Sequence, residues 1–178
     1  MNTYIAYNLE EAIQWEQEHL QNKTEGLCIL FHDKIMVQLG NPSSYDIEAI
    51  NGYDFAVWQS AHKAGTIVCF PGDISFYYIT KDANQLGKGV IDRAISYLKS
   101  LDLPDVELHN NDILIHGHKV ASWAEIRLPC GMVQSLAHFS INVDVEVIKK
   151  VCTKNVCKNP GRLSEYGVTT EMLYTNIL

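Results

Sequence analysis

Apolar residues along the chain recur with two different periods, which predicts both strands and helices. Short apolar or alternating runs bounded by turn residues are typical of strands, and they occupy residues 4–7, 27–31, 35–39, 55–59, 66–70, 74–80, 105–109, 113–123 and 133–143. The tripeptide His32-Asp33-Lys34 separates the second and third runs, which predicts a hairpin there. Another hairpin is expected around Pro129-Cys130-Gly131.

Helical periodicity is clearest between Asn84 and Leu101, where apolar positions recur every three or four residues. Gly87 and Gly89 lie in its first turns, and each weakens the helix by about 1 kcal/mol relative to alanine. Three further helices are predicted from polar residues that can accept the first free N–H groups of a helix. These helices follow Asn8, Asp144 and Thr169 and run to about His19, Cys152 and Asn176.

The composition is that of an ordinary globular protein, and it disfavours several classes of function. The chain has 178 residues, a net charge of −7 and no linker or repeat. We expect one α+β domain over residues 1–178, with a mixed, mostly antiparallel sheet flanked by helices. The acidic balance disfavours nucleic-acid binding, and no apolar run approaches the ~20 residues that span a membrane. An odd cysteine count without a leading signal segment favours a reducing, cytoplasmic compartment. The oligomeric state is left open.

The stretch from Asn111 to Ser122 is predicted to be a turn followed by a long strand with a lysine in its middle. In a continuous strand alternate side chains share a face, so Lys119 stands between the small residues Gly117 and Ala121. This arrangement predicts room for a ligand beside an amine. The alternative is an exposed strand lysine next to a bulge glycine.

Cys157 is the cysteine whose surroundings favour reactivity. A thiolate is stabilised by nearby positive charge, and five basic residues lie within fourteen positions here: Lys149, Lys150, Lys154, Lys158 and Arg162. The segment also has the composition of a loop, where functional residues are often carried. By contrast Cys28 and Cys69 sit within apolar strand patterns and are expected in the core. The alternative for Cys157 is an exposed thiol without a role.

Four segments resemble motifs of the biotin/lipoate protein ligase superfamily. Residues 111–122 resemble its Asn-Asp…Lys-[Ile/Val]-[Ala/Ser] strand, and residues 139–144 are similar to the run ending in Asn-x-Asp that follows it. Residues 154–157 look like the Ile-Asn-Pro-Cys of lipoyl(octanoyl) transferases. Residues 62–73 resemble the substrate loop Arg-Gly-Gly-x-x-x-x-His-x-Pro-Gly-Gln. Together the segments span a little over half the chain.

The resemblance implies a class II aminoacyl-tRNA synthetase/biotin ligase-like fold and an acyltransferase without a cofactor or metal. Such an enzyme takes a medium-chain acyl group from acyl carrier protein and passes it to a lysine of a lipoyl-domain protein. Lys119 matches the active-site lysine and Cys157 the acyl-accepting cysteine. The implied substrate-binding positions are His62, Lys63, Gly65, Cys69, Gly72, Asp73, Gly117, Ala121 and Ser122.

The chain departs from the transferase motifs mainly in the substrate loop. His62 replaces the leading arginine, and Lys63 and Ala64 replace two glycines whose bare backbone lets a ligand approach closely. Cys69 stands in place of the histidine and Asp73 in place of the glutamine. Val156 replaces the proline before the cysteine.

Three alternatives stay open. The first is an ATP-dependent lipoate- or biotin-protein ligase, whose chemistry Lys119 also fits. The second is an inactive module of the same fold that binds an acyl group or a protein, which the altered loop favours. The third is a metal site at His116 and His118, because two histidines on one strand face are a possible ligand pair.

Overall fold

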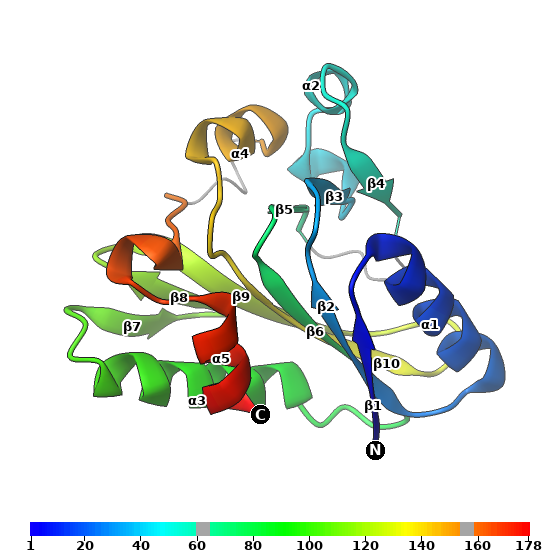
Figure 1. Ribbon diagram of the computed structural model, residues 1–178. Helices are drawn as coiled ribbons and strands as arrows, with labels where there is room; N and C mark the ends of the chain where they lie inside the picture. Colours follow the sequence, from blue (N-terminus) through cyan, green and yellow to red (C-terminus); the bar gives the residue numbers. More distant parts are fainter. Residues whose placement is uncertain (60–64, 154–158) are drawn as a thin grey trace.

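The computed structural model describes residues 1–59, 65–153 and 159–178, and a large twisted sheet forms its centre (Figure 1). Seven strands follow one another in the order β1 (Asn2–Ala6), β2 (Gly26–Phe31), β6 (Ile74–Thr80), β10 (Val133–Phe139), β9 (His118–Arg127), β8 (Asp112–Ile115) and β7 (Val106–His109). Only β1 and β2 run parallel; the other neighbours are antiparallel. The expected α+β class with a mixed, mostly antiparallel sheet is confirmed.

A second, smaller sheet packs over one face of the large one. Its three strands follow the order β4 (Ala56–Trp58), β3 (Met36–Gln38) and β5 (Ile67–Cys69). The helices are α1 (Leu9–Asn22), α2 (Ile47–Asn51), α3 (Leu86–Ser100), α4 (Val145–Val151) and α5 (Thr170–Ile177), with single 3-10 turns at Pro42–Ser44 and Leu163–Tyr166. No helix within the described ranges is long and apolar enough to cross a membrane.

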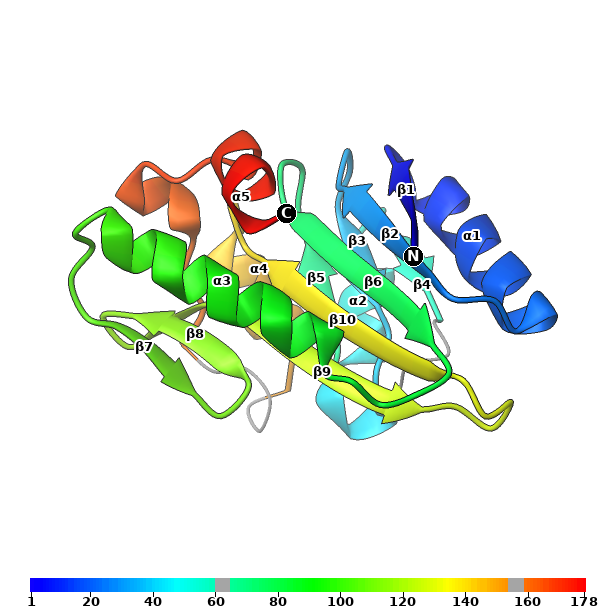
Figure 2. The ribbon, with the colours of Figure 1, turned by 90° about the horizontal axis from the view of Figure 1, so that it is seen from below.

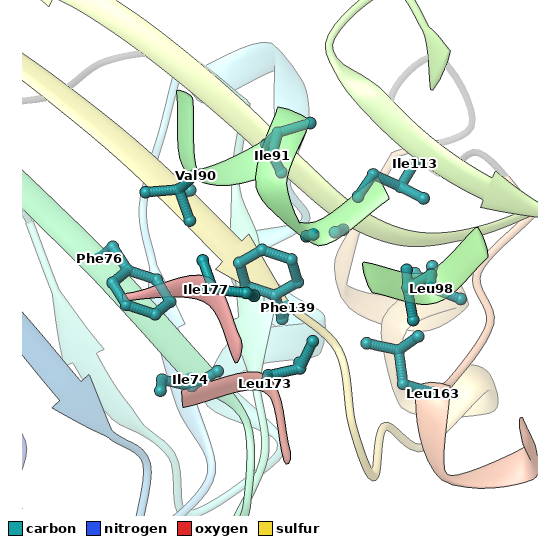
Figure 3. Packing of buried hydrophobic residues seen from close by; sticks show 14 of the residues in the cluster. Ile74, Phe76, Val90, Ile91, Leu98, Ile113, Phe139, Leu163, Leu173 and Ile177 are labelled. Carbon is teal, nitrogen blue, oxygen red and sulfur yellow. The ribbon is translucent and has the colours of Figure 1, made fainter. Parts of the chain in front are cut away.

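The two faces of the large sheet bury different sets of side chains, as the two-residue period of a strand requires. On β2, Leu27 and Ile29 point to the side that α3 and α5 cover (Figure 2). Phe76 and Phe139 meet edge to face in this layer, between the two helices (Figure 3). The alternate residues of β2 point instead toward α1 and the small sheet. The space between the two sheets is therefore a second interior layer.

The predicted helix starts are confirmed by their capping contacts. The Glu11 N–H donates to Asn8 Oδ1 at 2.9 Å, and the Glu11 carboxylate accepts the Asn8 side-chain amide and the Tyr7 N–H, each at 2.9 Å. This is a variant of the capping box, with the N–H of Tyr7 in place of that of Asn8. Asp144 and Thr169 accept N–H groups at the starts of α4 and α5 in the same way. These contacts fix where α1, α4 and α5 leave the sheets.

The hairpin predicted at residues 32–34 is wrong. Strand β2 pairs with β1 and β6, whereas β3 pairs with β4 and β5 in the small sheet. The connection crosses between sheets because His32 is buried, with its ring hydrogen-bonded to Ser75 on β6. A short polar tripeptide between apolar runs can form a hairpin within one sheet or a crossing between two sheets. Here the contact of His32 with Ser75 selects the crossing.

The continuous strand expected over residues 113–123 is also wrong. His116 and Gly117 have φ values of 50° and 72° and form a two-residue turn between β8 and β9. Positive φ at both positions is the conformation that matches the twist of a tight hairpin. Gly117 therefore does not flank Lys119 on one strand face, and His116 does not share a face with His118.

Candidate functional site

A row of polar side chains crosses the face of the large sheet that the small sheet covers. Asp112 of β8 pairs with Ser122 of β9, Ser122 pairs with His138 of β10, and His138 pairs with Ser75 of β6. Residues directly opposite each other on neighbouring strands project to the same side. Three of the four are buried, and Ser122 is half-buried. We call Asp112, Ser122, His138 and Ser75 the polar row.

Lys119 lies at the β8 end of the polar row. Its Nζ is 3.0 Å from Asp112 Oδ1, and the two side chains are 32% and 4% exposed. The charged hydrogen bond fixes the amine at the border between interior and solvent, where a ligand can reach it. Lys119 is thus held in place rather than free to sample the surface.

The backbone of Lys119 joins β9 to the segment that follows residues 154–158. The Lys119 N–H donates to the Asn159 carbonyl at 2.7 Å, and the Gly161 N–H donates to the Lys119 carbonyl at 2.9 Å. Pro160 forms a parallel bridge with Lys119 between these two bonds. A Cβ on Gly161 would lie 2.7 Å from the Cβ of His118, so this close approach needs glycine.

Asp73 fastens the Pro71-Gly72-Asp73 turn to the end of β10. One carboxylate oxygen accepts the N–H groups of Ile141 and Asn142 at 2.6 and 3.2 Å, and the other accepts the Phe70 N–H at 2.9 Å. Gly72 has φ 94°, and a Cβ there would lie 2.6 Å from the Asn142 side-chain nitrogen. Two of the segments that carry the resemblance, residues 62–73 and 139–144, are therefore in direct contact.

Burial sets the protonation of the groups around His138. It lowers the pKa of His32 to about 3 and that of His138 well below its usual value, so both imidazoles are neutral at pH 7. Burial also raises the pKa of Cys69 well above its usual value. The pKa of Asp73 rises to about 7 because burial outweighs the three N–H donors. His138 Nε2 lies 3.8 Å from Asp73 Oδ2.

The structure brings some of the predicted site residues together and separates others. Ser122 belongs to the polar row. Asp73 lies next to another member of the row, with its Oδ2 3.8 Å from His138 Nε2. Ala121 and Cys69 are buried, Gly72 is half-buried, and Gly65 and Gly117 are exposed. Gly117 lies in the β8–β9 turn. The predictions at His62, Lys63 and Cys157 fall outside the described residues.

The sequence analysis assigned no functional role to His32, Ser75 and His138, although the sequence contains a signal for two of them. Ser75 and His138 interrupt apolar runs whose other members are core residues, and a polar residue in a buried strand needs a partner. Ser75 and His138 are hydrogen-bonded to each other, and this partnership becomes visible only when β6 is paired with β10. Asp112 lay within a recognised motif, but its pairing with Lys119 depends on the β8–β9 turn.

Comparison with known proteins shows that this chain is similar to solved structures, whereas its sequence matches no protein-family model and no curated protein. LipL1 of P. falciparum in complex with lipoate matches 99% of this chain at 14% identity and a TM-score of 0.72. Lipoate-protein ligase A bound with ATP matches 99% of the chain at 12% identity and a TM-score of 0.71. A bi-partite lipoate protein ligase of Thermoplasma acidophilum, described with its E2 lipoyl domain, matches 99% at 12% identity and 0.70.

The chain therefore has the fold of the lipoate-protein ligases. It spans 59%, 83% and 80% of the length of those three structures, in the same order. A biotin protein ligase of Aquifex aeolicus also matches 99% of the chain, at 11% identity and a TM-score of 0.51, with 65% of its own length covered. The fold expected from the resemblance to the biotin/lipoate superfamily is confirmed.

Proposed function

We propose that the protein is an acyltransferase that moves a medium-chain acyl group from acyl carrier protein to a lysine of a lipoyl domain. The observation that carries the proposal is the placement of Lys119. Its amine is fixed by Asp112 at the end of the polar row, and its backbone is bonded to Asn159. Cys157 precedes Asn159 by two residues, a length of chain that spans at most about 7 Å. In this proposal the Cys157 thiol reaches the Lys119 amine, and the short connection to Asn159 is the support for it.

In the proposed first step the Cys157 thiolate attacks the carbonyl carbon of the donor thioester. The new carbon–sulfur bond forms as the carrier thiolate leaves and takes up a proton from the Lys119 ammonium, which leaves Lys119 as a neutral amine. The ammonium of Lys119 stabilises the Cys157 thiolate by charge. Backbone N–H groups near Gly72 or Ala121 are the proposed donors to the oxyanion, and one such donor contributes about 3 kcal/mol.

In the second step a lysine amine of the acceptor attacks the Cys157 thioester. An amide forms, and the Cys157 thiolate leaves with the help of the Lys119 charge. The attacking amine loses its proton to the neutral Lys119 left by the first step, which is the proposed general base, a role that contributes roughly 10²–10⁴-fold. The ammonium so formed carries the charge that stabilises the leaving Cys157 thiolate. The route uses no ATP and no cofactor.

The two protein substrates fit different features. The exposed amines of Lys149 and Lys150 at the end of α4 suit an acidic carrier protein, although Lys149 also forms an exposed ion pair with Glu146. The lipoyl domain as acceptor is supported by the Thermoplasma ligase, which is described with its E2 lipoyl domain. We place the proposed reaction in the cytoplasm, where cysteine side chains stay reduced.

Intact mass spectrometry after incubation with octanoyl carrier protein tests the first step. We expect the protein to gain one octanoyl group, which hydroxylamine removes, and Cys157→Ser to gain none. Cys130→Ser is the matched control, since Cys130 is exposed in the β9–β10 turn, and it is expected to gain the group. Absence of any adduct from every acyl thioester, with retained binding of the carrier protein, would favour the inactive binding module.

The second candidate function is an ATP-dependent lipoate ligase, and the ATP-bound neighbour favours it. A ligase would form an acyl-adenylate from ATP and free acid, and this step would not need Cys157. Pyrophosphate release that depends on lipoate or octanoate and persists in Cys157→Ser would support the ligase and contradict the thioester route.

A further inference from the structure

Three metal-ligating side chains converge in the layer between the two sheets, on segments far apart in the sequence. His32 follows β2, Cys69 ends β5 and His138 lies on β10. One ligand atom from each lies within 4.8 Å of the others, and all three residues are buried. We call His32, Cys69 and His138 the buried trio.

The two imidazoles of the buried trio do not stack, and one nitrogen of each ring faces the same point. The two imidazoles meet edge on, with centroids 5.8 Å apart and an interplanar angle of 84°. His32 Nε2 and His138 Nδ1 both lie 2.9 Å from the Ser75 hydroxyl oxygen, so both nitrogens point at one spot. Cys69 Sγ is 3.8 Å from His138 Nδ1.

These separations are close to those around a tetrahedral zinc ion. With Zn–N of about 2.1 Å and Zn–S of about 2.3 Å, neighbouring ligand atoms stand about 3.4–3.6 Å apart. The buried trio thus needs a contraction of about 1.4 Å at most. The Ser75 oxygen now occupies the point that both ring nitrogens face, and it would shift aside to become the fourth donor. Two nitrogens, one sulfur and one oxygen suit Zn²⁺ or Co²⁺ better than hard cations, which prefer oxygen ligands.

A separate observation comes from the other side of the His138 ring. Within the described part of the chain, His138 Nε2 is buried and has no hydrogen-bond partner, and it lies 3.8 Å from Asp73 Oδ2. Histidines that bind a metal through one ring nitrogen usually direct the other N–H at a carboxylate. Metal binding at Nδ1 would place the proton on Nε2, facing Asp73, and a small shift would complete that bond.

We propose that His32, Cys69 and His138 bind one Zn²⁺ ion that joins the small sheet to the large one. On binding, a Zn–S bond replaces the S–H bond of Cys69 and the thiol proton is released to solvent. The ion brings two positive charges, and the Cys69 thiolate and the Asp73 carboxylate balance them in the interior. The ion would hold the Pro71-Gly72-Asp73 turn against β10, beside the polar row. The site has a structural role and stands whether or not the proposed acyl transfer is correct.

Cobalt titration tests the site, because a thiolate bound to Co²⁺ gives a charge-transfer band in the near ultraviolet. Reduced protein, freed of metal with a chelator, is expected to develop the band up to one Co²⁺ per chain and to lose it when one equivalent of Zn²⁺ is added. Cys69→Ser should lose the band. Cys28→Ser is the matched control and should keep it, because Cys28 is also buried and faces the same layer.

Alkylation of the wild-type protein provides a test that does not depend on a variant folding. Iodoacetamide applied to the native, metal-free protein modifies accessible thiols such as Cys130, and the buried Cys69 should be spared. The cobalt band is expected to survive this treatment. No band in the wild type, a band that persists in folded Cys69→Ser, or a band that native alkylation abolishes would each overturn the proposal.

Discussion

At the scale of single residues, the Lys119–Asp112 pair gives the sharpest prediction about stability. Asp112 is nearly buried, so removing the ammonium beside it in Lys119→Met should lower the free energy of unfolding by about 1–2 kcal/mol, a value reduced by the partial exposure of Lys119. Urea unfolding of Lys119→Met, Asp112→Asn and the double variant measures the coupling. The exposed pair Lys88–Asp92 is the control, and Lys88→Met should change stability by less than about 0.5 kcal/mol. Strictly additive effects at Lys119 and Asp112 would contradict a direct pair.

Also at this scale, burial predicts which cysteines are inert. Burial raises the pKa of Cys28 to about 12, so at pH 8 only about one thiol in ten thousand is the reactive thiolate. Iodoacetamide at pH 8 should label the exposed Cys130 and leave Cys28 unlabelled until urea unfolds the protein. Peptide mapping by mass spectrometry distinguishes the two. Equal labelling rates in the native state would show that Cys28 is not in the core.

At the scale of elements, the two glycines of α3 should respond oppositely to alanine. A Cβ on Gly89 meets only the end of Arg93 at 3.7 Å, so Gly89→Ala should raise the free energy of unfolding by about 0.5–1 kcal/mol. A Cβ on Gly87 would lie 2.8 Å from Ser135 Oγ and 3.0 Å from the Leu136 carbonyl, so Gly87→Ala should lower it by about 1 kcal/mol or more. Urea unfolding midpoints of the two variants check this, and equal shifts would contradict the packing of α3 on β10.

The elements also show which local structures could be predicted from the sequence and which could not. The helices after Asn8, Asp144 and Thr169 were predictable because their capping contacts are local. The β8–β9 turn was not, because His116-Gly117 lacks the Asn-Gly or Asp-Gly pair that usually marks such a turn. Apolar residues occur on both sides of the turn without a clear change of period, so periodicity alone did not divide the run.

At the scale of the whole molecule, the central strands of the large sheet could be predicted from their apolar runs, whereas the small sheet could not be predicted. Strands β3, β4 and β5 have three residues each, and their pairing depends on contacts across many residues of chain. The candidate site shares this limit. Lys119 could be predicted from a local motif, but the polar row forms only when β6, β8, β9 and β10 stand in register. The pairing of strands, not any one segment, creates the interior layer in which His138 lies.

The central claim is transfer of an acyl group through a thioester, without ATP, onto a lipoyl domain. The most direct measurement is the mass of a lipoyl domain incubated with octanoyl carrier protein and this protein, in the absence of nucleotide. We predict one octanoyl group on the acceptor lysine with the wild type, and a loss of at least about 100-fold in rate for Lys119→Met. An acceptor that is modified only when ATP and free acid are supplied, or one that is never modified, would contradict the account.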